Sequence, residues 1–224
     1  MSEKHGCQAR AMIVAVVGAE STGKTTLAHD LVHALTELGH DTVVVHETLR
    51  AFCEKQGRTP RQDEQSEIAR QHTARIQGAA SRHAVVIADT TALMTAVYSD
   101  FIFGDLNLYP QAMQDHALAS VTLLTALDLP WVPDGHQSDG PHVQRPVDDR
   151  VRKALLSHGQ TFTVVGGRDR ARLDQSLAAV IHALGASKRA LRGVDAPGAA
   201  RWQWVCENCD APDSHQGLFS GLAP

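Results

Sequence analysis

Short apolar runs rich in β-branched residues recur along the chain, and the distances between them leave room for helices. The five runs are Met12–Val17, Thr42–Val45, Ala84–Ala88, Val121–Leu124 and Thr161–Val165. Runs this apolar are typical of strands that are buried on both faces of a sheet. The pattern therefore predicts a sheet that lies between two layers of helices.

The segments between these runs have helical patterning. In Thr25–Leu38 and Asp169–Leu184, a large aliphatic residue recurs every three or four positions, which predicts helices with one buried face. Arg61–Arg82 is polar, with Ile68 and Ile76 as its only large apolar residues, so we expect an exposed rim helix that contributes little core. Alternating strands and helices predict an α/β fold, a doubly wound parallel five-stranded sheet with its first strand at the centre.

The length of 224 residues fits one globular domain of about 150–200 residues and a short appendage. The composition changes near Gly185, after which small and basic residues predominate and Gly and Pro occur among them. We predict one domain over residues 10–185, a linker over 186–201 and a short Cys-containing tail over 202–224.

Charge and composition narrow the class of partner. The 25 acidic and 21 basic residues do not form long runs of one sign, and aromatic residues make up only 4% of the chain, so nucleic acid is an unfavourable partner. The apolar run Ala11–Ala19 is too short to span a bilayer and lacks a cleavage pattern, so we expect a cytoplasmic protein without a membrane partner. In that compartment Cys7, Cys53, Cys206 and Cys209 are expected to be thiols or metal ligands.

One motif indicates nucleotide chemistry. Gly18–Thr25 fits G-x-x-x-x-G-K-[ST], directly after an apolar run and at the start of a predicted helix. Backbone amides of such a loop converge on phosphates, Lys24 reaches the β and γ phosphates, and the Thr25 hydroxyl binds Mg²⁺. The alternative is a Gly-rich turn without a ligand. The sequence thus predicts a P-loop NTPase that uses ATP and Mg²⁺, and the expected ATP-binding residues are Gly18, Glu20, Ser21, Thr22, Gly23, Lys24, Thr25 and Thr26.

Two acids are expected at the carboxyl edge of the sheet, beside this loop. Asp89 ends the third run and is a candidate Mg²⁺-binding acid; its alternative role is to cap the helix that begins at Ala92. Glu47 follows the second run and is a candidate general base, with Arg50 one helical turn later to steady it or to bind phosphate. The alternative for Glu47 and Arg50 is a solvent-facing pair.

A Pro/Gly-rich loop over residues 128–137 leads to Arg145, Arg150 and Arg152 ahead of the next predicted helix. This arrangement resembles a lid over phosphates, and Arg145 and Arg152 are candidate catalytic residues that neutralise the transferred phosphoryl group. The alternative is that these arginines are simply solvated.

From about Ile13 to Leu184 the chain resembles the NadR-type nicotinamide riboside kinase family of P-loop ATPases. The matching pieces are Gly18–Thr26, Glu47–Arg50, Asp89–Thr90 with the helix through Tyr98–Gly104, and Asp128–Trp131 with Asp134–Gly135. The resemblance implies an ATP:ribosyl-nucleoside phosphotransferase of NAD metabolism. It implies that Lys24, Thr25 and Asp89 serve ATP and Mg²⁺, and that the acceptor lies near Glu47, Arg50, Trp131 and Asp134.

The chain departs from this family where aromatic residues usually surround the Glu, where a second Asp usually follows Asp-Thr, and where an Arg usually follows Asp-Gly. Here these positions hold His46, Thr48, Thr91 and Gln137. A flat pyridinium ring would then be held by Tyr98, Phe101 or Trp131, or the acceptor is a different nucleoside.

The tail contains Cys206-x-x-Cys209 and His215, which form part of a zinc-binding pattern. The remaining ligands would come from Asp210, Asp213 or Cys7, and the alternative is a tail with two ordinary thiols. Apolar residues of the tail can dock on the main domain or on a second subunit of a homo-oligomer; they are Trp202, Trp204, Leu218 and Phe219.

Together these features predict an ATP-dependent small-molecule kinase that phosphorylates the 5′-hydroxyl of nicotinamide riboside or a related nucleoside. The alternative is a nucleotide-dependent regulatory ATPase without a small-molecule acceptor. A third hypothesis, an enzyme acting on polynucleotides, is disfavoured by the acidic balance and the absence of a basic stripe.

Overall fold

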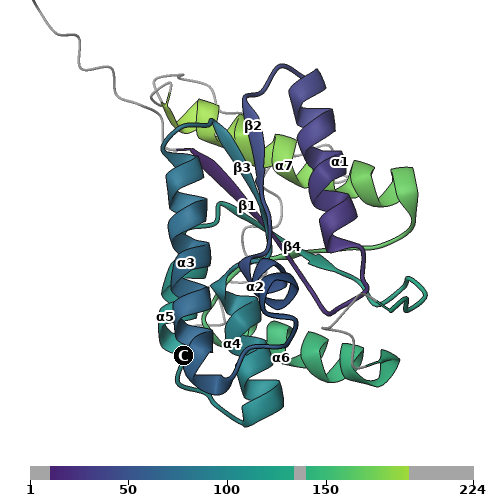
Figure 1. Cartoon of the computed structure of the whole chain (residues 1–224). Helices are drawn as coiled ribbons and strands as arrows, with labels where there is room; N and C mark the ends of the chain where they lie inside the picture. Colours follow the sequence, from purple (N-terminus) through teal and green to yellow (C-terminus); the bar gives the residue numbers. More distant parts are fainter. Residues whose placement is uncertain (1–10, 134–139, 192–224) are drawn as a thin grey trace, which may run out of the picture. The chain divides into compact units, whose positions relative to one another are not determined.

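The computed structural model describes residues 11–133 and 140–191. Five parallel strands form one sheet in the order β2-β3-β1-β4-β5, so the first strand lies at the centre as predicted (Figure 1). The strands are β1 (Met12–Val17), β2 (Thr42–Val45), β3 (Val85–Asp89), β4 (Val121–Thr125) and β5 (Thr163–Val165). Each predicted strand is present within two residues of its expected bounds.

Helices cover both faces of the sheet, as a doubly wound fold requires (Figure 1). The helices are α1 (Lys24–Glu37), α2 (Thr48–Gln56), α3 (Gln62–Ala80), α4 (Ala92–Phe103), α5 (Tyr109–His116), α6 (Gln144–Ser157), preceded by the short 3₁₀ helix η2 (Pro141–Val143), and α7 (Asp169–Leu191).

Alternate side chains of β1 enter different halves of the core because successive residues of a strand point to opposite faces. Val14 and Val16 pack with Leu27, Leu31 and other residues of α1 and with α7. On the opposite face, Ala15 and Val17 pack against α4, α5 and α6, and Ile13 packs against α3. The carboxyl end of the central strand leads directly into the predicted phosphate-binding loop.

The prediction that the helix within Arg61–Arg82 contributes little core is wrong. One face of α3 is buried, including Ile68, Ala69, Ile76 and Ala79. The prediction counted only large apolar residues, whereas small alanines and polar side chains complete this face. The same face buries the polar residues Gln65 and His72, which belong to the candidate site.

The arginines expected ahead of the helix after β4 lie inside it, which corrects the predicted order. Arg145, Arg150 and Arg152 all belong to α6. The helix forms because Val147 and Val151 recur at helical spacing on its buried face. A proline at position 146 does not prevent it, since the first turn of a helix tolerates proline.

The chain divides into two compact units, Met1–Ser187 and Lys188–Pro224. Helix α7 runs to Leu191, past its predicted end at Leu184 and into the segment predicted as a linker. The predicted tail with Cys206, Cys209 and His215 lies outside the described residues.

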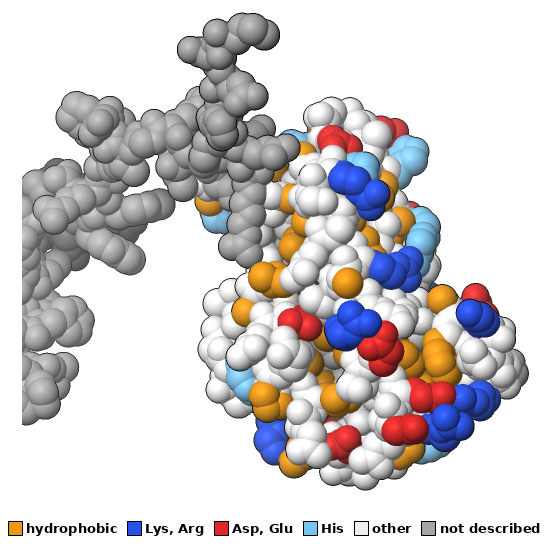
Figure 2. Space-filling view, turned by 60° about the vertical axis from the view of Figure 1, so that its left-hand side comes forward, with side chains coloured by type: hydrophobic (Ala, Val, Ile, Leu, Met, Phe, Trp, Pro, Cys, Tyr) orange, Lys and Arg blue, Asp and Glu red, His pale blue; other side chains and the backbone are white. Residues whose placement is uncertain are grey.

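None of the helices in the described ranges is long and apolar enough to cross a bilayer. On the face shown in Figure 2, Lys and Arg side chains lie beside Asp and Glu side chains. This mixing agrees with the absence of long runs of one charge in the sequence.

Candidate active site

The loop between β1 and α1 has the geometry of a phosphate cradle. Gly18 has a φ of 147°, and a Cβ on it would lie 2.1 Å from Oγ1 of Thr125, so only glycine fits. Gly23 precedes α1 with a φ of 77°, and Ser21 also has a positive φ of 54°. Such alternation turns successive backbone amides toward one point at a helix N-terminus, where anions bind. The motif thus has the backbone that phosphate binding requires.

Lys24 lies among three acids. Its ammonium donates a 2.7 Å hydrogen bond to the carbonyl oxygen of Ala19. Burial lowers the pKa of Lys24, and the carboxylates of Glu47, Asp89 and Glu20 act in the opposite direction. Lys24 is thus a buried cation with carboxylates close by, and Arg50 is a second positive charge near it.

Asp89 and Thr25 meet beside this lysine. The Thr25 hydroxyl donates a 2.8 Å hydrogen bond to Oδ2 of Asp89, which is only 2% exposed. Oδ1 of Asp89 is buried without a hydrogen-bond partner in the part of the chain that the structure describes. The N-cap position of α4 is Thr91, so the alternative in which Asp89 caps this helix does not apply.

These two side chains suit a magnesium ion. Hydroxyl and carboxylate oxygens are the ligands that Mg²⁺ prefers, and a buried carboxylate oxygen without a partner fits a bound cation. Across residues 11–133 and 140–191, no group of three or more His, Cys, Asp or Glu could hold a metal ion. A magnesium ion held by Thr25 and Asp89 would take its other ligands from phosphate oxygens and water, as Mg²⁺ commonly does with nucleotides.

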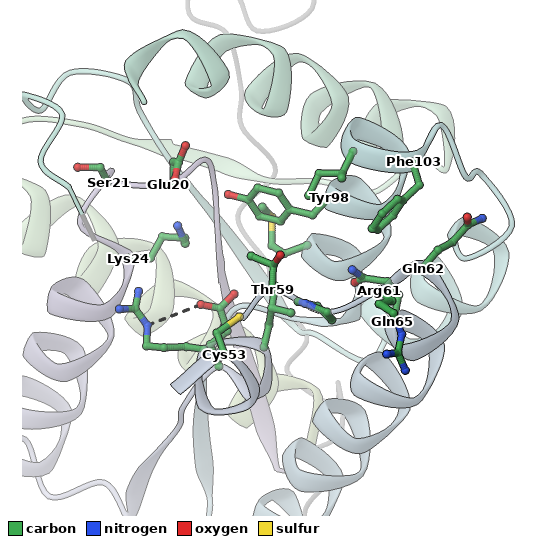
Figure 3. A pocket seen from close by; sticks show the side chains of 16 residues that line it. Glu20, Ser21, Lys24, Cys53, Thr59, Arg61, Gln62, Gln65, Tyr98 and Phe103 are labelled. Carbon is green, nitrogen blue, oxygen red and sulfur yellow. Dashed lines mark ion pairs between the residues drawn. The ribbon is translucent and has the colours of Figure 1, made fainter. Parts of the chain in front are cut away.

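Glu47 occupies the N-cap position of α2, just after β2. Its carboxylate lies 3.9 Å from Nε of Arg50, the ion pair drawn dashed in Figure 3. The expected alternative was a solvent-facing pair, but Glu47 is only 9% exposed and Arg50 is half-buried. Glu47 is therefore a carboxylate inside the site, beside Lys24.

A cleft of about 350 Å³ opens from the phosphate loop, and we call it the α2–α4 cleft after the helices at its sides. Figure 3 shows Glu20, Ser21 and Lys24 on one side of it and Gln62, Gln65 and Phe103 on the other. Its lining residues are Glu20, Ser21, Lys24, Glu47, Leu49, Arg50, Cys53, Thr59, Pro60, Arg61, Gln62, Gln65, Met94, Tyr98, Ile102 and Phe103. The structure thus brings Lys24, Glu47, Arg50 and Tyr98 to one cavity.

Other predicted residues lie elsewhere. Trp131 does not line this cleft; the backbone amide of its neighbour Val132 donates a 2.7 Å hydrogen bond to Oγ of Ser21. Arg145 is exposed in the first turn of α6. Arg152 donates a 2.6 Å hydrogen bond to Asp148 on the same helix. The predicted residue Asp134 lies outside the described residues.

Arg172 of α7 was not predicted from the sequence. It is 4% exposed, and its guanidinium donates to the carbonyl oxygens of Thr22 and of Gly167 and pairs with the carboxylate of Asp128. Arg172 therefore fastens the back of the phosphate loop to the segments after β4 and β5. The sequence around Arg172 does not signal this role, because two of its three partners, Thr22 and Asp128, are distant in the chain.

His72 of α3 connects the two segments that bear the acids. Its Nδ1 lies 3.0 Å from Oγ1 of Thr48, next to Glu47, and its Nε2 lies 3.0 Å from the carbonyl oxygen of Thr90, next to Asp89. Because a carbonyl oxygen only accepts, Nε2 carries the proton and Nδ1 accepts from the threonine hydroxyl. Burial lowers the pKa of His72, which favours this neutral form.

Gln65 was also missed, although the sequence contained a signal for it and for His72. Both lie on the stripe of α3 that Ile68 and Ile76 define at spacings of three and four residues. Polar residues on an apolar stripe are buried with it, so they were candidates for the site.

Comparisons with known proteins agree with this architecture. A family model described as "AAA domain" matches residues 13–172. Two crystal structures of NadR protein are similar in fold, one in complex with NAD and AMP-PNP (TM-score 0.63) and one in complex with NR (TM-score 0.64). Each is 19% identical and covers 78% of this chain and 50% of the NadR chain, so this chain spans about half of the NadR length.

Thymidylate kinase from Ehrlichia chaffeensis is also similar, with a TM-score of 0.54 and 17% identity over 78% of this chain and 99% of the kinase. No match to the chain was found among curated proteins. At these identities the likeness confirms the predicted resemblance at the level of the fold, a P-loop nucleotide-binding fold of the kinase type.

Proposed function

Since the chain belongs to the AAA domain family, we propose that it is an ATP-dependent small-molecule kinase that phosphorylates the 5′-hydroxyl of nicotinamide riboside or a related nucleoside. The observation that carries the proposal is the α2–α4 cleft. Its volume of about 350 Å³ lies within the range of about 300–1,000 Å³ typical of small-molecule sites. It opens beside Lys24, where an acceptor would meet the γ-phosphate of ATP.

The phosphate loop would hold ATP. Backbone amides between Gly18 and Thr25 would bind its phosphates, and Thr26 would follow them in the first turn of α1. Lys24 would neutralise the β and γ phosphates. Thr25 and Asp89 would hold Mg²⁺, which supplies charge neutralisation at the phosphates when it is bound.

Glu47 would act on the acceptor. Its carboxylate would accept the proton of the 5′-hydroxyl as the hydroxyl oxygen attacks the γ-phosphorus and the bond to the ADP oxygen breaks. Arg50 lies within ion-pair distance of Glu47 and would fix its orientation. Glu47 is suited to this role because it is buried in the cleft and close to Lys24.

An arginine would stabilise charge on the transferred group. Arg145 is the better supported candidate, because the side chain of its neighbour Gln144 donates a 2.9 Å hydrogen bond to the carbonyl oxygen of Glu20 in the phosphate loop. Arg152 is the second candidate, although its guanidinium is paired with Asp148.

The acceptor base would lie along Tyr98, whose ring lines the cleft beyond Lys24 (Figure 3). A tyrosine face suits a flat cationic ring such as a pyridinium. Trp131 does not line the cleft and Asp134 lies outside the described residues, so their contacts with the acceptor stay predictions from the sequence.

The proposal is tested by coupled ADP release with Mg·ATP across a panel of nucleosides that includes nicotinamide riboside. A kinase turns over faster in the presence of one of them. Slow ADP release that no nucleoside stimulates would favour the regulatory ATPase instead.

A further inference from the structure

The carboxamide of Gln65 lies in the wall of the α2–α4 cleft. The residue is 1% exposed, and Figure 3 shows it across the cleft from Lys24 and Ser21. Its Oε1 is buried without a hydrogen-bond partner among the residues that the structure describes. Buried polar groups are rarely left unpaired, because the free energy lost when they leave water is then not recovered by a hydrogen bond in the protein. A partner for Gln65 is therefore expected from a molecule that enters the cleft.

The surroundings of Gln65 do not supply such a partner. The lining of the cleft includes the apolar side chains of Met94, Ile102 and Phe103 from α4. Two polar lining residues on the side of Gln65 bond to other groups, Arg61 to Glu64 and Gln62 to Asp105. Apolar side chains with a few convergent polar groups are the usual design of a small-molecule pocket, in which the polar groups fix orientation. Gln65 thus has the position of a group that selects among ligands of similar shape.

We propose that Gln65 determines which acceptor base the cleft accepts, by pairing with a base edge that presents an N–H donor beside a carbonyl or ring-nitrogen acceptor. The inference rests on the proposed kinase function and specifies its acceptor class. A carboxamide has one donor group and one acceptor, so it binds a complementary donor–acceptor edge through two hydrogen bonds. An acceptor that carries a carboxamide fits, and the matching carboxylate has no N–H to offer Oε1.

The position of Gln65 also orients the acceptor. The reacting hydroxyl belongs near Glu47 and Lys24, and Gln65 lies on the opposite side of the same cleft. Pairing of the base at Gln65 would therefore hold the ribose toward the phosphate loop. Sites built to bind an N–H reject analogues that lack it far more strongly than apolar pockets reject a missing methylene.

The test compares nicotinamide riboside with nicotinic acid riboside, which differ only in carboxamide against carboxylate. Binding is measured by calorimetry, and kcat/KM is measured by ADP release, for the wild type, Gln65→Leu and Gln77→Leu. Gln77 is an exposed glutamine of the same helix outside the cleft, so it is the matched control.

The wild type and Gln77→Leu are expected to favour the amide at least about tenfold, whereas Gln65→Leu should discriminate by less than about twofold. Because Oε1 is unpaired, Gln65→Leu should not lower the Tm. A wild type that binds neither compound or shows no preference overturns the inference, as does a preference that survives Gln65→Leu. Preferential binding without phosphorylation supports the role of Gln65 and counts against the kinase function alone.

Discussion

The hydroxyl of Thr25 donates a 2.8 Å hydrogen bond to Oδ2 of Asp89 and so joins the first turn of α1 to the end of β3. The second oxygen of Asp89 is buried and has no hydrogen-bond partner among the described residues. This pairing places a hydroxyl and a carboxylate where a nucleotide-bound magnesium ion would need them. The same contact links two motifs that are far apart in the sequence.

Asp89→Asn should therefore lower the affinity of the site for Mg²⁺ with little effect on the fold. The amide oxygen can still accept from Thr25, but the charge that attracts the cation is lost. We expect kcat to fall by about 10²- to 10³-fold and the Mg²⁺ concentration for half-maximal activity to rise. Unchanged kcat and Mg²⁺ dependence would remove Asp89 from the metal site.

Glu47→Gln tests the proposed general base. The substitution keeps the size of the side chain but removes its ability to take a proton, so kcat should fall by about 10²- to 10⁴-fold. The KM for ATP should stay within a few fold, because Glu47 is assigned to the acceptor. Phosphorylation at the wild-type rate would exclude Glu47 as the base.

Gly18→Ala should destabilise the protein. The added Cβ would lie 2.1 Å from Oγ1 of Thr125, at a φ of 147° that non-glycine residues rarely adopt. We expect a loss of about 1–3 kcal/mol or more in the free energy of unfolding. Gly78→Ala is the control; no atom lies within 4 Å of its Cβ position in α3, and alanine there should stabilise by about 0.5–1 kcal/mol. Equal effects of the two substitutions in chemical denaturation would contradict the close packing at Gly18.

His72→Phe tests whether His72 positions the acid-bearing segments. Phenylalanine fills a similar volume but cannot bridge Thr48 and Thr90, so Glu47 and Asp89 should lose their alignment. We expect kcat to fall by about 10- to 100-fold, with a smaller change in the KM for ATP. The exposed His33→Phe serves as the control. A variant with normal kcat and a lowered Tm would leave His72 a purely structural role.

Acid should destabilise the protein through its buried histidines. His116 lies between the hydroxyls of Thr91 and Thr122, and burial lowers its pKa from 6.5 to about 4. The unfolded chain binds this proton first, so the stability contributed by neutral His116 is present above pH 6.5 and is lost as the pH falls toward 4. The loss is on the order of 3 kcal/mol at pH 4.

His116→Gln should flatten this pH dependence of the unfolding free energy, measured by denaturant titration between pH 7 and pH 4. The exposed His33→Gln should leave the slope as it is in the wild type. An unchanged slope in His116→Gln would show that other groups cause the acid sensitivity.

The sheet and the phosphate loop were predictable because their signals are local. Each strand is a short apolar run, and the loop motif at Gly18–Thr25 carries its own backbone requirement. Asp89 and Glu47 followed from the geometry of a parallel sheet, whose strands end at one edge. These parts of the site needed no knowledge of how the helices pack.

The rest of the site depends on packing between helices. The cleft forms where α2, α3 and α4 meet, and Arg172 reaches the phosphate loop from the last described helix. Gln65 was not predicted as a site residue because the sequence of α3 is too polar to indicate a buried helix. Alanines complete the buried face of this helix. Arg145 and Arg152 were expected ahead of the helix after β4, whereas Val147 and Val151 give α6 a buried face that begins within this arginine-rich segment.

The most direct test of the kinase function follows the phosphoryl group itself. ATP labelled with ¹⁸O in the γ-phosphate is incubated with Mg²⁺, the protein and each nucleoside of the panel, nicotinamide riboside included. The products are identified by mass spectrometry, with Lys24→Ala as the control. The proposed function predicts a labelled 5′-phosphorylated nucleoside with the wild type and none with Lys24→Ala. Label found only in inorganic phosphate, with the nucleosides of the panel unchanged, would contradict it.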